Sequence, residues 1–108
     1  MSLRRFIIEM GMGNDLHGQD YTKAACRAVQ DALHGSSLAI LKNRPETRDA
    51  LQVKVTIGVQ EPTRVDQVKV LALLSVGEVT LDVIHGGLNA QDAVVAQASV
   101  EAFLPQQG

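Results

Sequence analysis

The sequence predicts a single α+β domain in which two or three helices pack on one face of a four-stranded mixed or antiparallel sheet. Four separate segments alternate between apolar and polar residues, as half-buried strands do, and a segment of helical periodicity follows the first of them. The length of 108 residues is enough for one domain, spanning residues 1–108, with one modest core. The expected order is strand, helix, strand, short helix, strand, strand.

The first strand is expected at residues 4–10. One of its faces is wholly apolar, with Phe6, Ile8 and Met10, and the other is mixed. Ile7 lies between two charged residues on the mixed face. We therefore expect that the helices of this chain leave the mixed face uncovered and that a partner chain covers part of it.

A helix is expected at residues 20–33. Asp20 is a suitable N-cap, and apolar residues then recur at helical spacing with charged residues opposite them. Many of these apolar residues are alanines, which would let the helix lie close to the sheet. A second helical piece is expected at residues 36–41, and Pro45 would stop it.

Residues 51–59 form the clearest strand pattern, with apolar residues at every second position. Residues 65–74 favour a short helix, although their alternation also fits a strand. A third strand is expected at residues 78–85, with Ile84 on the uncovered face. Residues 93–103 predict the last strand, and a helix is the alternative because alanine is common there.

The composition excludes several classes of function. The net charge is -2, and the sequence has neither a basic run nor an aromatic stacking platform, so we expect no nucleic-acid partner. No apolar run approaches the roughly 20 residues that span a bilayer, so no membrane partner is expected. Cys26 is the single cysteine, which excludes an internal disulfide and favours a cytoplasmic location.

The aromatic content of 3% predicts a core of small aliphatic side chains. Such a core buries little area per residue, and self-association is a common remedy in small domains. We therefore expect a homo-oligomer.

The stretch at residues 11–20 concentrates the polar and glycine residues that packing alone does not require. Glycine lets a ligand or another chain approach the backbone closely, so Gly11, Gly13 and Gly18 are expected to form a tight, bare-backbone turn. The alternative is an ordinary strand-to-helix turn in which Asp20 caps the helix.

Asp15 and His17 are the candidate catalytic residues. In an extended segment, residues two apart point the same way, so a carboxylate and an imidazole would lie side by side and share a proton. Together with Asp20 and His85 they are also conceivable metal ligands. Since two ligands two residues apart are a weak signal, no metal ligands are assigned, and the sequence leaves open whether a metal or another cofactor binds.

Further ligand-binding groups are expected around this pair. They are the backbone of the three glycines, the amide of Gln19, the carboxylate of Asp20 and the positive charge of Lys23. His85 begins a second glycine loop and is the candidate for another wall of the site, although a turn ending a strand is the plainer explanation. Cys26 is expected to face the sheet from an alanine-rich helix, and a buried cysteine packs far more often than it reacts, so a nucleophilic role is not expected.

The chain resembles the Lin0512 family of small conserved hypothetical proteins through a Gly-x-Gly-x-Asp-x-His-Gly motif. The motif is intact as Gly11, Gly13, Asp15, His17 and Gly18. Residues 19–25 and 55–59 also look like the family. The family has no established activity, so the resemblance implies a site and not a reaction.

Two functions remain open at this point, and whether the chain is an enzyme is undecided. The first is an enzyme or binding protein for a small polar molecule, with Asp15 and His17 at a subunit interface. The second is a non-catalytic structural or regulatory homo-oligomer in which the loop makes subunit contacts.

Overall fold

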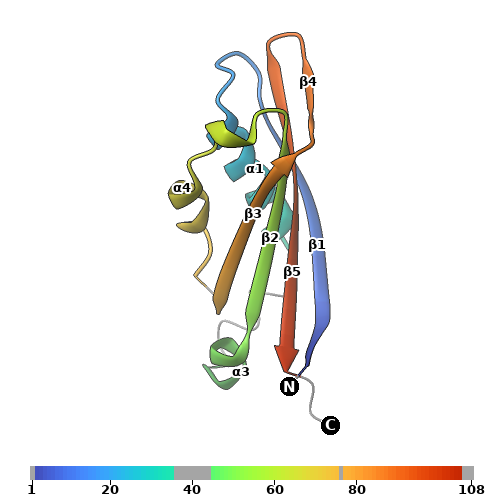
Figure 1. Cartoon of the computed structure of the whole chain (residues 1–108), viewed down its shortest axis with the longest axis vertical. Helices are drawn as coiled ribbons and strands as arrows, with labels where there is room; N and C mark the ends of the chain where they lie inside the picture. The colour runs from blue at the N-terminus through green and yellow to red at the C-terminus, as the bar shows by residue number, and fades with distance from the viewer. Residues whose placement is uncertain (1, 36–44, 76, 106–108) are drawn as a thin grey trace.

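The computed structural model describes residues 2–35, 45–75 and 77–105, and these form one sheet of five strands with helices on one side (Figure 1). The sheet order is β1-β5-β2-β3, and the short strand β4 pairs with β5. The pair β2/β3 is parallel and the other pairs are antiparallel. The strands are β1 (Leu3–Asp15), β2 (Gln52–Val59), β3 (Glu78–His85), β4 (Leu88–Ala90) and β5 (Ala93–Pro105).

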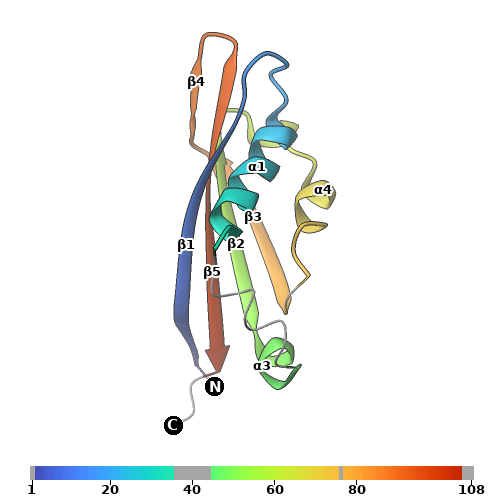
Figure 2. The same cartoon turned by 180° about the vertical axis from the view of Figure 1, so that it is seen from behind.

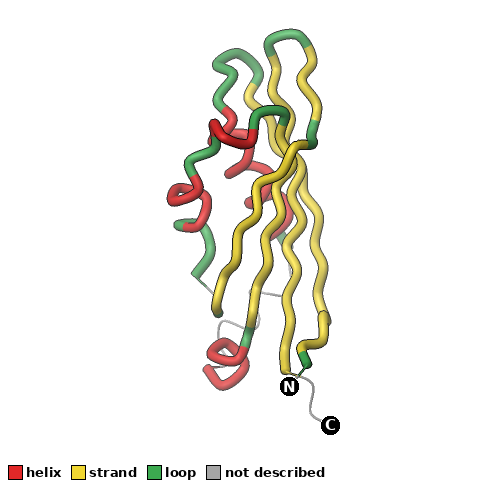
Figure 3. The backbone as a smooth tube through the Cα atoms, viewed as in Figure 1, coloured by secondary structure: helices red, strands yellow, loops and turns green. Residues whose placement is uncertain are grey.

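The helices are α1 (Tyr21–Leu33), α3 (Pro45–Ala50), α4 (Gln67–Leu71) and the 3₁₀ helix η1 (Pro62–Arg64). Helix α1 lies in front of the strands in Figure 2, with α4 beside it and packed against it, while α3 lies at one end. We call the opposite side of the sheet the open face, which is toward the viewer in Figure 3. Among the described residues, no helix combines the length and apolar character that a membrane crossing requires.

The core consists of small aliphatic side chains, as the composition predicts. Alanines of α1 meet the inward-facing valines, alanines and isoleucine of the two central strands. The members with almost no exposure include Ala24, Ala28, Val55, Ile57 and Val100. This packing confirms the α+β class. The sheet has five strands and not the four expected, because the short strand β4 was not predicted.

Strand β4 lies in a segment that the sequence analysis treats as a glycine loop. Its three residues pair with the beginning of β5 beyond the end of β2. Gly87 has a φ of 64°, and an added Cβ there would clash with the carbonyl oxygen of Val95. Glycine is therefore required for the turn that brings β4 beside β5.

The two undecided segments are resolved by the structure. Residues 67–71 form a helix whose N-cap, Asp66, accepts hydrogen bonds from the backbone N–H groups of Val68 and Lys69. Residues 93–105 form strand β5. The helical piece expected at residues 36–41 lies outside the described residues.

The prediction of which face of β1 is covered was wrong. The apolar residues Ile8 and Met10 lie on the exposed side, with Met10 68% exposed, whereas Ile7 packs against the core; Phe6 is also exposed, at a bulge between Arg5 and Ile7 where the alternation breaks. Alternation shows which residues share a face but not which face is buried. Ile84 is exposed on the open face, as expected.

The reason for this orientation is the pair of glycines in β1. Gly11 and Gly13 are buried under α1, and an added Cβ would clash with the helix backbone, at Ala28 and Ala32 for Gly11 and at Ala24 and Ala28 for Gly13. A strand with side chains at both positions could not admit the helix so closely. The expected bare-backbone turn is therefore corrected: both glycines are strand residues that pack against α1.

Candidate functional site

The candidate site lies where β1 ends and α1 begins. Strand β1 continues to Asp15, and residues 16–20 form the connection to the helix. Asp15 is 7% exposed and turns toward the covered side of the sheet. Its Oδ2 accepts hydrogen bonds from the backbone N–H groups of Gly18 at 3.1 Å and Asp20 at 2.9 Å.

These contacts hold Asp15 in its charged form. The hydrogen bond from the Asp20 backbone is the largest cause of a lowered pKa for Asp15. Burial opposes this shift, while the positive charges of Lys23 and Arg27 and the hydrogen bond from Gly18 add to it. The nearest atom of Arg27, Nη1, is 3.9 Å from Oδ1. A carboxylate held in this way is a poor proton acceptor at neutral pH, and it closes the loop instead.

His17 faces a different residue from the one expected. Its Nδ1 is 3.6 Å from Oδ2 of Asp92 in the turn between β4 and β5, and the two side chains are 87% and 64% exposed. The described hydrogen bonds and ion pairs do not join His17 to Asp15. Strand β1 ends at Asp15, so the alternation that would place both side chains together does not extend to His17.

The remaining predicted residues are divided between structural and exposed positions. Asp20 is the N-cap of α1 and accepts a hydrogen bond from the Lys23 backbone N–H at 3.0 Å. Gln19 is exposed with a φ of 50°, which is uncommon for a residue with a side chain. His85 ends β3 in register with Val59, so in the described part of the chain its strand pairing is with β2 and not with the first loop.

Gly18 has a specific structural role in this loop. An added Cβ at Gly18 would lie 2.9 Å from Oδ2 of Asp15, the atom that receives the two backbone hydrogen bonds. A side chain at this position would therefore push on the carboxylate that closes the loop.

A polar cluster that the sequence analysis missed lies beside this loop. The hydroxyl of Tyr21, a residue that is 3% exposed, donates to Oε2 of Glu61 at 2.9 Å and accepts from Nδ2 of Asn89 at 2.7 Å. The Arg64 guanidinium lies 4.9 Å from the centre of the Tyr21 ring and 3.2 Å from the Glu61 carboxylate. The cluster ties α1 to η1 and β4.

The signal for this cluster in the sequence was slight. Tyr21 is the single tyrosine and directly follows the N-cap, which marks it as unusual. Its partners are 40 and 68 residues away, so no local spacing connects them to it.

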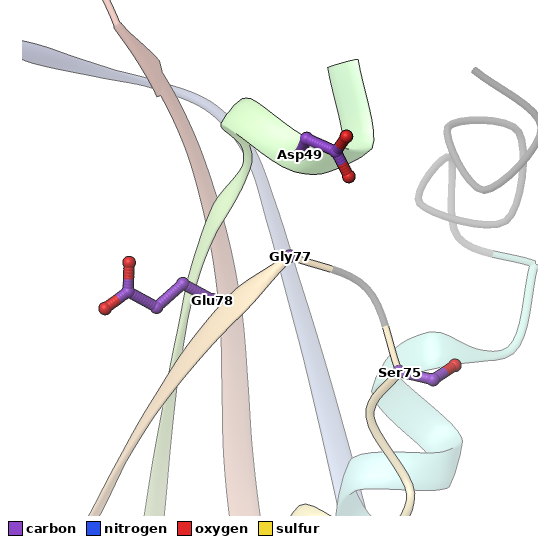
Figure 4. A pocket seen from close by; sticks show the side chains of 4 residues that line it. All are labelled: Asp49, Ser75, Gly77 and Glu78. Carbon is purple, nitrogen blue, oxygen red and sulfur yellow. The ribbon is translucent and has the colours of Figure 1, made fainter. Parts of the chain in front are cut away.

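Metal binding finds no support in the described residues, which contain no group of three or more His, Cys, Asp or Glu side chains suited to an ion. A shallow pocket of about 470 Å³ is lined by Asp49, Ser75, Gly77 and Glu78 (Figure 4). The Asp49 and Glu78 carboxylates point in different directions in Figure 4 and do not converge on one position.

Comparison with solved structures identifies a similar protein that matches this chain over almost its whole length. The crystal structure of an FtsZ-like protein of unknown function from Nostoc punctiforme PCC 73102 shares 32% sequence identity with this chain and superposes with a TM-score of 0.84. The match covers 98% of this chain and 99% of that one. No curated protein matches the sequence.

A family model confirms the resemblance expected from the sequence. The model described as conserved hypothetical protein, Lin0512 family, matches residues 5–102, which include the loop and most of every strand. The chain therefore belongs to the Lin0512 family.

Proposed function

We propose that this chain is the subunit of a non-catalytic homo-oligomer with a structural or regulatory role, located in the cytoplasm. The observation that carries the proposal is the open face of the sheet, where large apolar side chains remain in water. Ile8, Met10 and Met12 are 49%, 68% and 58% exposed along a single strand. Contiguous apolar patches of this kind mark interaction sites in soluble proteins.

The internal contacts of the loop support a non-catalytic role. Asp15 is occupied by two backbone hydrogen bonds, Asp20 caps α1, and Gly11 and Gly13 admit the helix. Each of these residues therefore has a folding role that accounts for its identity. In this proposal the Gly-x-Gly-x-Asp-x-His-Gly motif joins β1 to α1 and does not form an active site.

A second candidate function is favoured by one observation. His17 and Asp92 bring an imidazole and a carboxylate together at 3.6 Å, and both are exposed to a ligand. An acid–base role toward a small polar molecule would use this pair instead of Asp15 and His17. Both side chains are exposed to solvent in the single chain. A second subunit or the ligand itself would therefore have to cover this site and exclude water from it.

The oligomeric state of the untagged chain tests the first proposal. We expect light scattering coupled to size-exclusion chromatography to give a mass that is a multiple of 11.6 kDa and that falls on dilution. A mass of one subunit at every concentration up to about 100 µM, a level at which specific homo-oligomers are normally assembled, would refute the proposal.

Native mass spectrometry and two variants test the second candidate. A bound small molecule that is lost in both His17→Ala and Asp92→Asn, with the oligomer intact, would favour the acid–base function. Because the two side chains are 87% and 64% exposed, neither change should unfold the chain.

A further inference from the structure

The strand register divides the open face into two halves of different chemistry. Toward the β4 end, the side chains that lie side by side across the strands carry no charge. We call this region the uncharged half; it consists of Met12, Gln97, Ile84, Asn14, Val95 and Leu88, together with the Gly86–Gly87 backbone that lies over Gly58. Met10, Ser99, Thr56 and Asp82 form the row at its border, and Asp82 is the one charged residue of that row. The other half carries charges on every strand, namely Arg5, Glu101, Lys54 and Glu78.

We infer that a second copy of this chain docks face to face on the uncharged half, so that the sheets of two subunits stack through Met12 and its neighbours. This inference rests on the proposed function and specifies its partner and contact. It differs from the loop contact expected from the sequence, because the interface is the sheet and not residues 16–20.

The apolar area is suited to such an interface. Met12, Ile84 and Leu88 of the uncharged half and Met10 at its border are between 45% and 68% exposed, which amounts to an apolar patch on the order of 400 Å². A standard interface buries about 800 Å² per partner, of which about 65% is apolar in homodimers, or roughly 500 Å². The patch therefore supplies most of the apolar part of one standard interface.

The charge pattern favours a second copy over a different protein. A two-fold interface brings each patch onto itself, so any charge near its centre meets an identical charge. The uncharged half avoids this repulsion, and its methionines can adapt to an identical surface. The charged half would form the rim, where Arg5 is already paired with Glu101 at 3.0 Å.

Pairing through the edge of β1 is hindered by α1. The backbone N–H of Met12, which points away from the sheet, donates to Oδ2 of Asp31 at 2.9 Å. The carbonyl oxygen of Asn14 accepts from Nη1 of Arg27 at 2.7 Å. Because this N–H group and this carbonyl oxygen already have hydrogen-bond partners on α1, a strand of another chain cannot form a continuous ladder of hydrogen bonds along this part of β1. The open face of the sheet is therefore the surface that we propose for docking.

The first test is methionine oxidation of the wild-type chain with dilute hydrogen peroxide. Met10 and Met12 are the reporters, and mass spectrometry of peptides measures their rates at protein concentrations where light scattering gives monomer and oligomer. We expect both methionines to react several-fold more slowly in the oligomer. Equal rates in the two states would overturn the face-to-face contact, although an oligomer would still support the proposed function.

The second test compares two charge substitutions on the same face. Met12→Glu introduces a charge into the uncharged half, and Thr80→Glu introduces the same charge in the charged half, beside Lys54. We expect Met12→Glu to raise the dissociation constant of self-association by about thirtyfold or more, as for a hot-spot residue, and Thr80→Glu to leave it within about threefold.

The outcomes separate the two proposals. Equal effects of the two variants on an intact oligomer would overturn the face-to-face contact alone. A wild-type chain that is monomeric throughout would overturn both proposals. If Met12→Glu fails to fold by circular dichroism, the oxidation rates of the wild-type chain decide the question without it.

Discussion

Gly13→Ala would place a methyl group where the backbone of helix α1 already lies. The added Cβ would clash with the Ala28 nitrogen and the Ala24 carbonyl oxygen, which are backbone atoms and cannot turn aside as a side chain would. The helix as a whole must therefore move away from β1, and buried alanines would lose contacts with the sheet. This is overpacking of a core whose members are almost completely buried.

The size of the effect follows from two opposing contributions. Overpacking of this kind costs about 1–3 kcal/mol, and more where the backbone must shift. Alanine also restricts the unfolded chain, which stabilises the folded state by about 0.4–1 kcal/mol. We expect the free energy of unfolding to fall by about 2 kcal/mol, and the melting temperature by roughly 10 °C for a domain of this size.

Urea unfolding followed by circular dichroism measures this change. The control is Gln30→Ala, which replaces an exposed residue of the same helix and should change the free energy of unfolding by less than about 0.5 kcal/mol. All variants are compared at one protein concentration, because self-association raises apparent stability. A Gly13→Ala variant as stable as the wild type would refute the close packing of α1 on β1.

Three further predictions concern polar contacts. The pKa of Asp15 lies below its ordinary 3.8, so the stability that this group contributes is complete above that pH and is lost as the pH falls through the folded-state pKa. The urea midpoint of Asp15→Asn should therefore fall less steeply below about pH 4 than the midpoint of the wild type. Parallel curves for the two proteins would contradict this prediction. Tyr21→Phe removes the hydroxyl that bonds Glu61 and Asn89, and calorimetry should show a loss of about 1–3 kcal/mol, whereas no loss would mean that water replaces the hydroxyl. Asp31→Ala frees the Met12 N–H at the edge of β1, so light scattering should show faster aggregation on mild heating than for Gln30→Ala, and equal rates would show that Asp31 does not protect the edge.

Much of the fold is encoded in local patterns that the sequence displays openly. Period-two alternation located β2 and β5, and helical spacing after Asp20 located α1. These patterns are readable because each residue's contribution depends only on neighbours a few positions away. The strand β4 was missed because three residues in a glycine-rich turn show no period.

The site was harder to predict because its contacts are distant in the chain. The motif correctly marked the junction of β1 and α1, but it did not reveal that Asp15 closes the loop while His17 faces Asp92. The Tyr21 cluster joins segments that are 40 and 68 residues apart. Such partners become neighbours only when the sheet brings β4 and η1 beside the start of α1.

The sequence by itself determined the α+β class, the positions of most elements, the small aliphatic core and the membership of the Lin0512 family, because these depend on residue type and short spacing. Only the tertiary structure decided which face of β1 is buried. Both faces of that strand carry apolar residues, so hydrophobicity alone cannot choose between them. The choice is made by Gly11 and Gly13, since helix α1 can approach the strand closely only on the side that lacks Cβ atoms, and the more apolar side is thereby left in water.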